Sequence, residues 1–183
     1  PLEQALLVNQ LLEKVGEFEK PKYFTYNEKV CAHGRNGKVG CSACSDVCST
    51  GAISSLFKGG QGSVEVNPNL CMGCGACATV CPSGAMRYNY PSVVHQGKEL
   101  KALVTVYSAE AKKLNQALAP SLLLHTLKAG TQLIDGLGRS AHVLPKQFEG
   151  LPSFVIPYGI EHIASTGLDL WLGALSYGFS EIT

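Results

Sequence analysis

The residues with the clearest capacity for chemistry are eight cysteines, all between residues 31 and 81 of a 183-residue chain. Thiolates are strong ligands for soft metal ions. Disulfide scaffolds usually spread their cysteines through the whole of a small domain, whereas the rest of this chain contains none. The crowding therefore favours metal binding over a disulfide framework. The cysteines are Cys31, Cys41, Cys44, Cys48, Cys71, Cys74, Cys77 and Cys81.

The last four cysteines have the spacing Cys-x2-Cys-x2-Cys-x3-Cys-Pro, which runs from Cys71 to Pro82. This spacing is typical of bacterial-type [4Fe–4S] sites. One tight loop can bind three corners of a cluster, while the fourth cysteine lies a helical turn further on and points to another cluster. Gly73, Gly75 and Ala76 are small enough to let backbone N–H groups approach the inorganic sulfides.

The cysteine region contains an internal repeat. Residues 41–53 align with residues 74–86, which lie 33 positions later, and residues 24–31 align with residues 64–71, which lie 40 positions later. Each repeat predicts a short strand, a cysteine loop, a short helix and a Gly-Ala turn. Two such units facing each other predict a small α+β domain.

One insertion distinguishes the first repeat from the second. Nine residues separate Cys31 from Cys41, whereas two residues separate the corresponding cysteines of the second repeat. The dipeptide Asn36-Gly37 is a strong turn signal, so we expect the insertion to form a small hairpin-like loop. Cys31 would still reach its cluster if this loop bulged outward and returned.

Residues 22–90 resemble the bacterial-type ferredoxins with two [4Fe–4S] clusters, on the cysteine run and the repeat described above. The resemblance implies crossed ligation, in which the last cysteine of each repeat binds the cluster of the other. It implies one cluster held by Cys31, Cys41, Cys44 and Cys81, and a second held by Cys71, Cys74, Cys77 and Cys48. The long spacing after Cys31 departs from the family pattern, as does Ser49 in place of the proline found at Pro82.

Several alternatives remain open for this region. Structural zinc also uses paired cysteines, although a three-cysteine loop crowds a tetrahedral ion. If Cys31 did not bind, a three-iron cluster or an open iron site would result. His33 is a hydrogen-bond donor near a cluster, a rare ligand or, as such histidines more often are, a solvated loop residue. Arg35 and Lys38 either steer an acidic redox partner or, more commonly for such residues, keep the loop soluble.

The flanking segments predict three parts: an N-terminal helical segment (1–21), a two-cluster ferredoxin-like domain (22–92) and a partial α/β domain with a parallel sheet (93–183). The N-terminal helix is expected over residues 2–18, packed on a neighbouring domain or on the cluster module. The predicted C-terminal elements are a strand (100–107), helices (109–118 and 121–128), a strand (152–157), a helix (160–177) and a strand from residue 180.

The C-terminal half offers no chemistry that stands out. Gly136-Leu-Gly138 lacks the preceding strand and the third glycine of a dinucleotide loop. His125, His142 and His162 are isolated and are expected to be core or surface residues. The general pattern of this half resembles small α/β subunits of hydrogenase and heterodisulfide-reductase systems, and large bacterial multidomain 4Fe–4S binding proteins.

The composition narrows the class of function. A net charge of +1 gives no electrostatic footprint for nucleic acid, and no apolar run approaches the roughly 18 residues of a membrane span. Both ends look cut, which predicts a fragment of a larger cytoplasmic protein. No residue is placed as nucleophile, acid or base. We therefore expect an electron-transfer module that serves a redox partner protein or a fused oxidoreductase domain. The alternative is an iron–sulfur sensor of redox state or iron, or an interaction domain in which clusters hold the fold.

Overall fold

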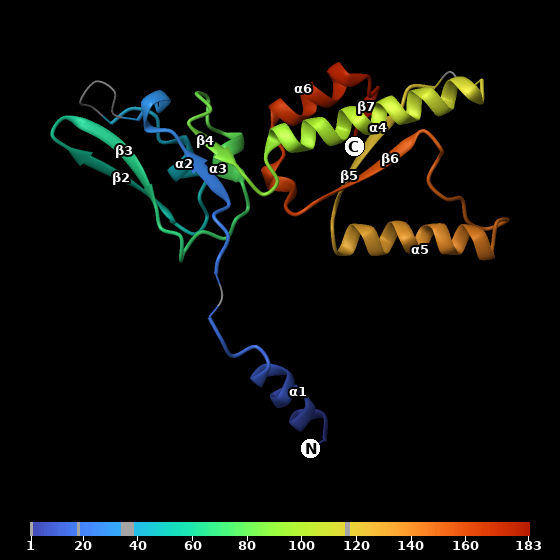
Figure 1. The fold of residues 1–183 in the computed structure, drawn as a ribbon, viewed down its shortest axis with the longest axis horizontal. Coiled ribbons are helices and arrows are strands. Elements are labelled where there is room, and N and C mark those ends of the chain that lie inside the picture. The colour runs from blue at the N-terminus through green and yellow to red at the C-terminus, as the bar shows by residue number, and fades with distance from the viewer. Residues whose placement is uncertain (1, 18, 34–38, 116–117) are drawn as a thin grey trace.

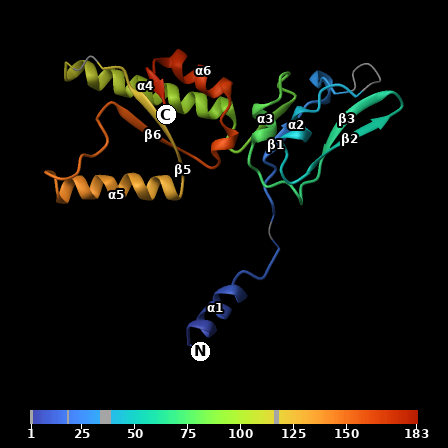
Figure 2. The same cartoon turned by 180° about the vertical axis from the view of Figure 1, so that it is seen from behind.

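The computed structural model describes residues 2–17, 19–33, 39–115 and 118–183, and Figures 1 and 2 show them from opposite sides. An N-terminal helix is followed by a cysteine-containing part with short strands and helices, and then by a part in which helices cover a parallel sheet. This mixture of helices and strands agrees with the predicted α+β class. None of the described helices is long and apolar enough to cross a membrane.

Helix α1 (Leu2–Leu12) is shorter than the predicted helix over residues 2–18. Its last turn tightens, because Lys14 N–H bonds to Leu11 O and Val15 N–H bonds to Leu12 O, and the chain leaves the helix before Gly16. The helix lies apart from the rest of the described chain in both views (Figures 1 and 2), and none of its residues is buried. In this structure α1 therefore does not pack on the cluster module, and its predicted alternative, packing on a neighbouring domain, stays a prediction.

The cysteine-containing part is built from two antiparallel pairs of strands. Strand β1 (Phe24–Tyr26) pairs with β4 (Met86–Tyr88), and β2 (Ile53–Lys58) pairs with β3 (Gln61–Val66). Each pair joins one strand from the first repeat to one from the second, so neither repeat forms a sheet by itself. The remaining elements here are η1 (Glu28–Val30), α2 (Ala43–Asp46) and α3 (Ala76–Thr79).

The β2–β3 hairpin turns at Gly59 and Gly60, whose φ angles are +60° and +81°. Such a two-residue turn needs two left-handed residues and matches the twist of the strands, which is why glycine occupies both positions. The hairpin supplies Ile53 and Val64 to a small apolar core completed by Met86 of β4. Four cysteines pack against this core: Cys44, Cys48, Cys77 and Cys81.

The C-terminal part contains a three-stranded parallel sheet of order β6-β5-β7. Helices α4 and α6 cover one face and α5 lies on the other (Figure 1). A core that includes Leu100, Val104, Leu122 and Leu170 packs between the sheet and the first two helices. The elements are α4 (Val93–Lys113), β5 (Ser121–Thr126), α5 (Ala129–Val143), β6 (Val155–Ile160), η2 (Ile163–Ser165), α6 (Leu168–Tyr177) and β7 (Glu181–Ile182).

A parallel sheet was predicted, but its central strand and two of the helices that cover it were not. Residues 100–107, predicted as a strand, lie inside α4, and residues 121–128, predicted as a helix, contain β5. Helix α5 was not predicted at all. The predicted strand at 152–157 begins later, as β6, while the helix end at Gly178 and the strand after residue 180 are confirmed.

Candidate iron–sulfur site

Six of the eight thiols lie on the loops beside η1, α2 and α3, while Cys44 lies within α2 and Cys77 within α3. Cys31 follows η1, the next three lie in or beside α2, and the last four lie in or beside α3. All eight are half-buried and none forms a disulfide. The site is therefore supplied by loops and two short helices, which the strand pairs β1–β4 and β2–β3 flank.

Two glycines shape the loop of the second repeat. Gly73 and Gly75 have φ angles of +72° and +79°, a region that side chains disfavour. A Cβ at Gly73 would lie 2.7 Å from the ring of Tyr23, and a Cβ at Gly75 would lie 2.4 Å from Cβ of Ser165 in η2. Close packing on both sides of the loop, as well as backbone conformation, therefore requires glycine. These are two of the small residues that the sequence singled out.

The charges of two other cysteines, one from each repeat, act on the Cys44 thiol. Burial raises the pKa of the Cys44 thiol, and the neighbouring thiolates of Cys31 and Cys81 raise it further. Cys31 comes from the start of the first repeat and Cys81 from the end of the second. The Cys44 thiol is thus within electrostatic range of one cysteine from each repeat.

The charges of four other cysteines, from both repeats, act on the Cys77 thiol. Burial raises the pKa of the Cys77 thiol to about 12, with further contributions from the charges of Cys74 and Cys71 and then of Cys44 and Cys48. Cys48, the last cysteine of the first repeat, thereby lies near the loop of the second repeat. Cys44, a cysteine of the first repeat, is therefore also within electrostatic range of the Cys77 thiol.

Cys48, the trailing cysteine of the first repeat, is stabilised as a thiolate by its own turn. Burial by itself raises the pKa of Cys48, but hydrogen bonds from the Thr50 hydroxyl and from the backbone N–H groups of Ala52, Thr50 and Ile53 outweigh it and lower the pKa. The Thr50 hydroxyl oxygen lies 3.5 Å from the sulfur. This turn therefore favours the charged form that binds metals.

Cys81 has the same surroundings in the second repeat. Burial raises the pKa of Cys81, but the Met86 N–H, the Ser83 hydroxyl and the N–H groups of Ser83 and Ala85 outweigh this effect and lower it. The Met86 nitrogen lies 3.3 Å from the sulfur. Both trailing thiols are thus prepared as anionic ligands by equivalent residues.

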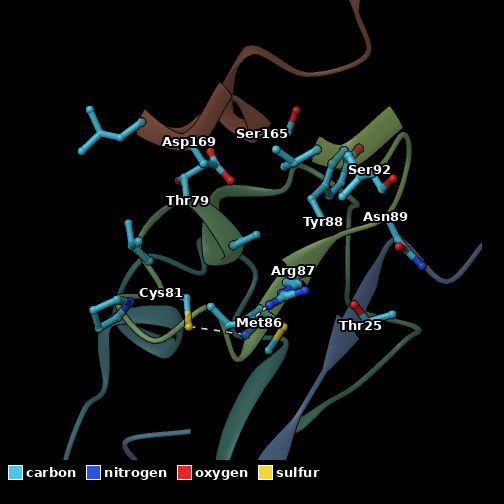
Figure 3. A pocket seen from close by; sticks show the side chains of 17 residues that line it. Thr25, Thr79, Cys81, Met86, Arg87, Tyr88, Asn89, Ser92, Ser165 and Asp169 are labelled. Carbon is cyan, nitrogen blue, oxygen red and sulfur yellow. Dashed lines mark hydrogen bonds between the residues drawn. The ribbon is translucent and has the colours of Figure 1, made fainter. Parts of the chain in front are cut away.

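A cavity of about 720 Å³ opens beside Cys81. Figure 3 shows Cys81 and Met86 at one end and Thr79, Ser165 and Asp169 at the other, with the bond between Met86 N–H and Cys81 drawn as a dashed line. The Cys81 side of the site is therefore accessible from a hollow between α3, β4 and the C-terminal part.

His33 is not the solvated loop residue that such histidines more often are, since its side chain is only 3% exposed. Its Nδ1 lies 2.7 Å from the carbonyl oxygen of Cys41, and its Nε2 lies 2.7 Å from Oγ of Ser55. Both ring nitrogens already have partners. The turn at Asn36-Gly37 and the side chains of Arg35 and Lys38 lie outside the described residues.

Sequence reasoning missed two tyrosines at the site. The Tyr88 hydroxyl donates to the carbonyl oxygen of Gly73 at 2.9 Å, and burial, followed by the charge of Glu161, raises the pKa of Tyr88 to about 12. Burial and a hydrogen bond with Cys31 raise the pKa of Tyr26 to about 12. The sequence shows the alternating pattern of both strands. It does not show which tyrosine hydroxyl would reach which cysteine loop.

The remaining residues that the sequence singled out lie in the C-terminal part. Gly136 and Gly138 are inside α5, so they form no loop. His125 contacts the carbonyl oxygen of Thr126 through Nδ1, and His162 precedes η2. Nothing in these contacts suggests a second site.

The donor set fits an iron–sulfur cluster. The thiols, the N–H groups directed at sulfur and the apolar core behind them are the features that such clusters need. Among the described residues, no three His, Cys, Asp or Glu side chains are close enough to bind one metal ion.

Comparison with known families agrees with this chemistry. A family model described as a 4Fe-4S dicluster domain matches residues 39–85, about a quarter of the chain. The matched segment contains every cysteine except Cys31. No curated protein matches the chain. The match and the eight cysteines support iron–sulfur binding, and electron transfer as the general class of function.

Proposed function

We propose that this chain binds two [4Fe–4S] clusters and passes single electrons through them, as a module of a larger oxidoreductase or redox complex. When bound, each cluster gains and loses one electron. The observation that carries the proposal is the packing of two cysteines from each repeat, Cys44, Cys48, Cys77 and Cys81, against one small apolar core.

The ligand sets of the proposal are crossed. The first cluster takes its ligands from around Cys44, with Cys81 as the contribution of the other repeat, and the second takes them from around Cys77, with Cys48 as the exchanged ligand. The strand pairings and the equivalent turns after Cys48 and Cys81 support a pseudo-two-fold module. The sets are Cys31, Cys41, Cys44 and Cys81 for the first cluster, and Cys71, Cys74, Cys77 and Cys48 for the second.

The closeness of the two sets explains why the module would conduct rather than only store electrons. Cys44 and Cys77 belong to different sets, yet the charge of one raises the pKa of the other. An electron on one cluster would therefore be near the other. The donor and acceptor are proposed to be a redox partner protein or a fused oxidoreductase domain, in the cytoplasm.

The parts of the chain have different roles in this proposal. Residues 22–92 form the two-cluster domain, while residues 1–21 and 93–183 form a helical segment and an α/β part. The contact between Gly75 and Ser165 supports a direct role of the α/β part in covering the loop of the second cluster. Electrons would leave from a face that this part does not cover.

The test is anaerobic purification followed by metal analysis and reduction. We expect about eight iron and about eight sulfide per chain, and reversible reduction of both clusters, with transfer of the electrons to a one-electron viologen dye. Stoichiometric zinc without a brown chromophore would contradict cluster binding. Clusters that are lost on oxidation, without reversible cycling, would instead indicate a sensor.

A further inference from the structure

The insertion between Cys31 and Cys41 is closed at its base by His33. The Cys41 N–H donates to the carbonyl oxygen of Ala32 at 3.4 Å, and the His33 Nδ1 lies 2.7 Å from the Cys41 carbonyl oxygen. A carbonyl oxygen accepts, so Nδ1 carries the proton. The two ends of the insertion are therefore joined by one backbone bond and one side-chain bond.

The same imidazole attaches this base to the β2–β3 hairpin. In the neutral ring with a proton on Nδ1, Nε2 accepts from the Ser55 hydroxyl, 2.7 Å away. The ring also contacts Phe57, with centroids 5.7 Å apart. Ser55 and Phe57 both belong to β2, which follows the Cys48 turn. His33 thus links the insertion to a strand that the structure already holds in place.

His33 also contributes directly to the environment of Cys31. Its backbone N–H donates to the Cys31 sulfur at 3.4 Å, and an N–H bond to a ligand sulfur raises the reduction potential of an iron–sulfur cluster. Movement of the imidazole would move this N–H, since both belong to one residue. Both ring nitrogens have protein partners, so the side chain has none left for iron.

We propose that His33 is a positioning residue, which holds Cys31 and Cys41 together as ligands of one cluster despite the nine residues between them. The inference rests on the proposed two-cluster function. In the second repeat, short spacing does the same task, because only Met72 and Gly73 separate Cys71 from Cys74. In the first repeat, a buried histidine with a hydrogen bond at each ring nitrogen takes the place of that short spacing.

The test compares His33→Ala, His33→Asn and His33→Gln in the whole chain. Asparagine places an amide donor near the position of Nδ1 and can keep the bond to Cys41, whereas glutamine places its amide near the position of Nε2 and can keep only the contact with Ser55. We expect the alanine and glutamine variants to fall from about eight to about four iron per chain, with the second cluster retained. We expect asparagine to keep both clusters.

Two serines of β2 provide a variant and a control that test the hydrogen bond at Nε2 of His33. Ser55→Ala removes the hydroxyl that bonds to Nε2, and we expect both clusters to remain while the potential of the first becomes more negative. Ser54→Ala changes the neighbouring exposed serine, whereas the hydrogen bond of the imidazole is to Ser55. We expect no effect on either cluster.

Hydrogen exchange separates this inference from the proposed function. The peptide that contains Cys41 should exchange at least about tenfold faster in His33→Ala than in the unaltered chain, whatever metal is bound, because its N–H bond to Ala32 is no longer supported. If the unaltered chain bound fewer than two clusters but this acceleration occurred, the proposed function would fail and the closure by His33 would stand.

An alanine variant with about eight iron, unchanged potentials and unchanged exchange would overturn the inference. Equal loss of both clusters in the alanine and asparagine variants would also overturn it, by showing only a general folding role.

Discussion

The backbone N–H of Asn27 donates to the carbonyl oxygen of Ala85 at 2.9 Å, which bonds the start of the first repeat to the end of the second. The bond from Asn67 N–H to Ala52 O, at 2.7 Å, does the reverse. Ala52 and Ala85 each follow a trailing cysteine by four residues. The repeats therefore exchange their ends, and each trailing thiol is carried toward the loop of the other repeat.

Replacing Cys31 tests the least supported ligand, since the family match begins at residue 39. The charge of Cys31 acts on the Cys44 thiol, and under the proposed ligand sets we expect Cys31→Ala to damage the first cluster alone. Iron should fall from about eight to about seven or about four per chain, depending on whether a three-iron cluster survives. Electron paramagnetic resonance should show the second cluster unchanged. Two intact four-iron clusters in this variant would mean that Cys31 is not a ligand.

Replacing Gly75 tests the contact between the cysteine loop and the C-terminal part. Alanine there is disfavoured by the φ of +79° and also meets Cα of Ser165 at 2.8 Å. Gly84→Ala is the matched control, because its φ is +63° but its nearest neighbour, Arg87, is 3.8 Å away. We expect the control to lose about 1–2 kcal/mol of unfolding free energy and Gly75→Ala to lose clearly more. Equal losses, measured by urea unfolding, would argue that η2 does not press on this loop.

Replacing Leu100 tests whether the α/β part folds without help from the clusters. Leu100 is fully buried in α4 among Val104, Leu122 and Leu170. Leu100→Ala should cost about 2–5 kcal/mol in the unfolding of this part and leave the iron content unchanged. The control is Val106→Ala on the same helix, where the side chain is 64% exposed. Loss of iron in the Leu100 variant would show that the two parts fold as one unit.

Tyr158 gives the α/β part a dependence on alkaline pH. Burial, and then its hydrogen bond to Glu99, raise the pKa of Tyr158 well above its usual value. A raised pKa in the folded state means that this contribution to stability is complete below about pH 10 and is lost as the pH rises above it. Tyr158→Phe should therefore show a smaller fall in unfolding free energy than the unaltered chain between pH 9 and pH 11, by urea unfolding. Parallel curves would contradict the assignment.

The cysteine spacing and the repeat predicted the mixed α+β class of the part near the site. Short strands and helices occur at the predicted places, as β1, α2, β3, α3 and β4, whereas β2 was not predicted. These elements are dictated by local signals, namely the Asn turns before the cysteines and the glycines after them. The bond from His33 to Ser55 was not predictable, because it joins residues 22 positions apart across the fold.

The C-terminal errors have a common physical cause. The run Val104-Thr-Val106 has strand propensity, but Gln96, Leu100, Val104 and Ala111 are the buried residues of α4 and recur at helical intervals. Burial of that stripe outweighs the local preference. The opposite error arose at Leu122-Leu-Leu124, where a continuous apolar run was taken for a helix. A central parallel strand is covered on both faces and so shows no alternation.

The most direct test of the central claim is spin quantitation by electron paramagnetic resonance after full anaerobic reduction. Each reduced [4Fe–4S] cluster contributes one unpaired electron, so crossed ligation by eight cysteines predicts about two spins per chain. The spectrum should be broadened by coupling, because Cys44 and Cys77 of the two ligand sets are neighbours. About one spin per chain, or no signal from protein that contains zinc, would contradict the two-cluster account.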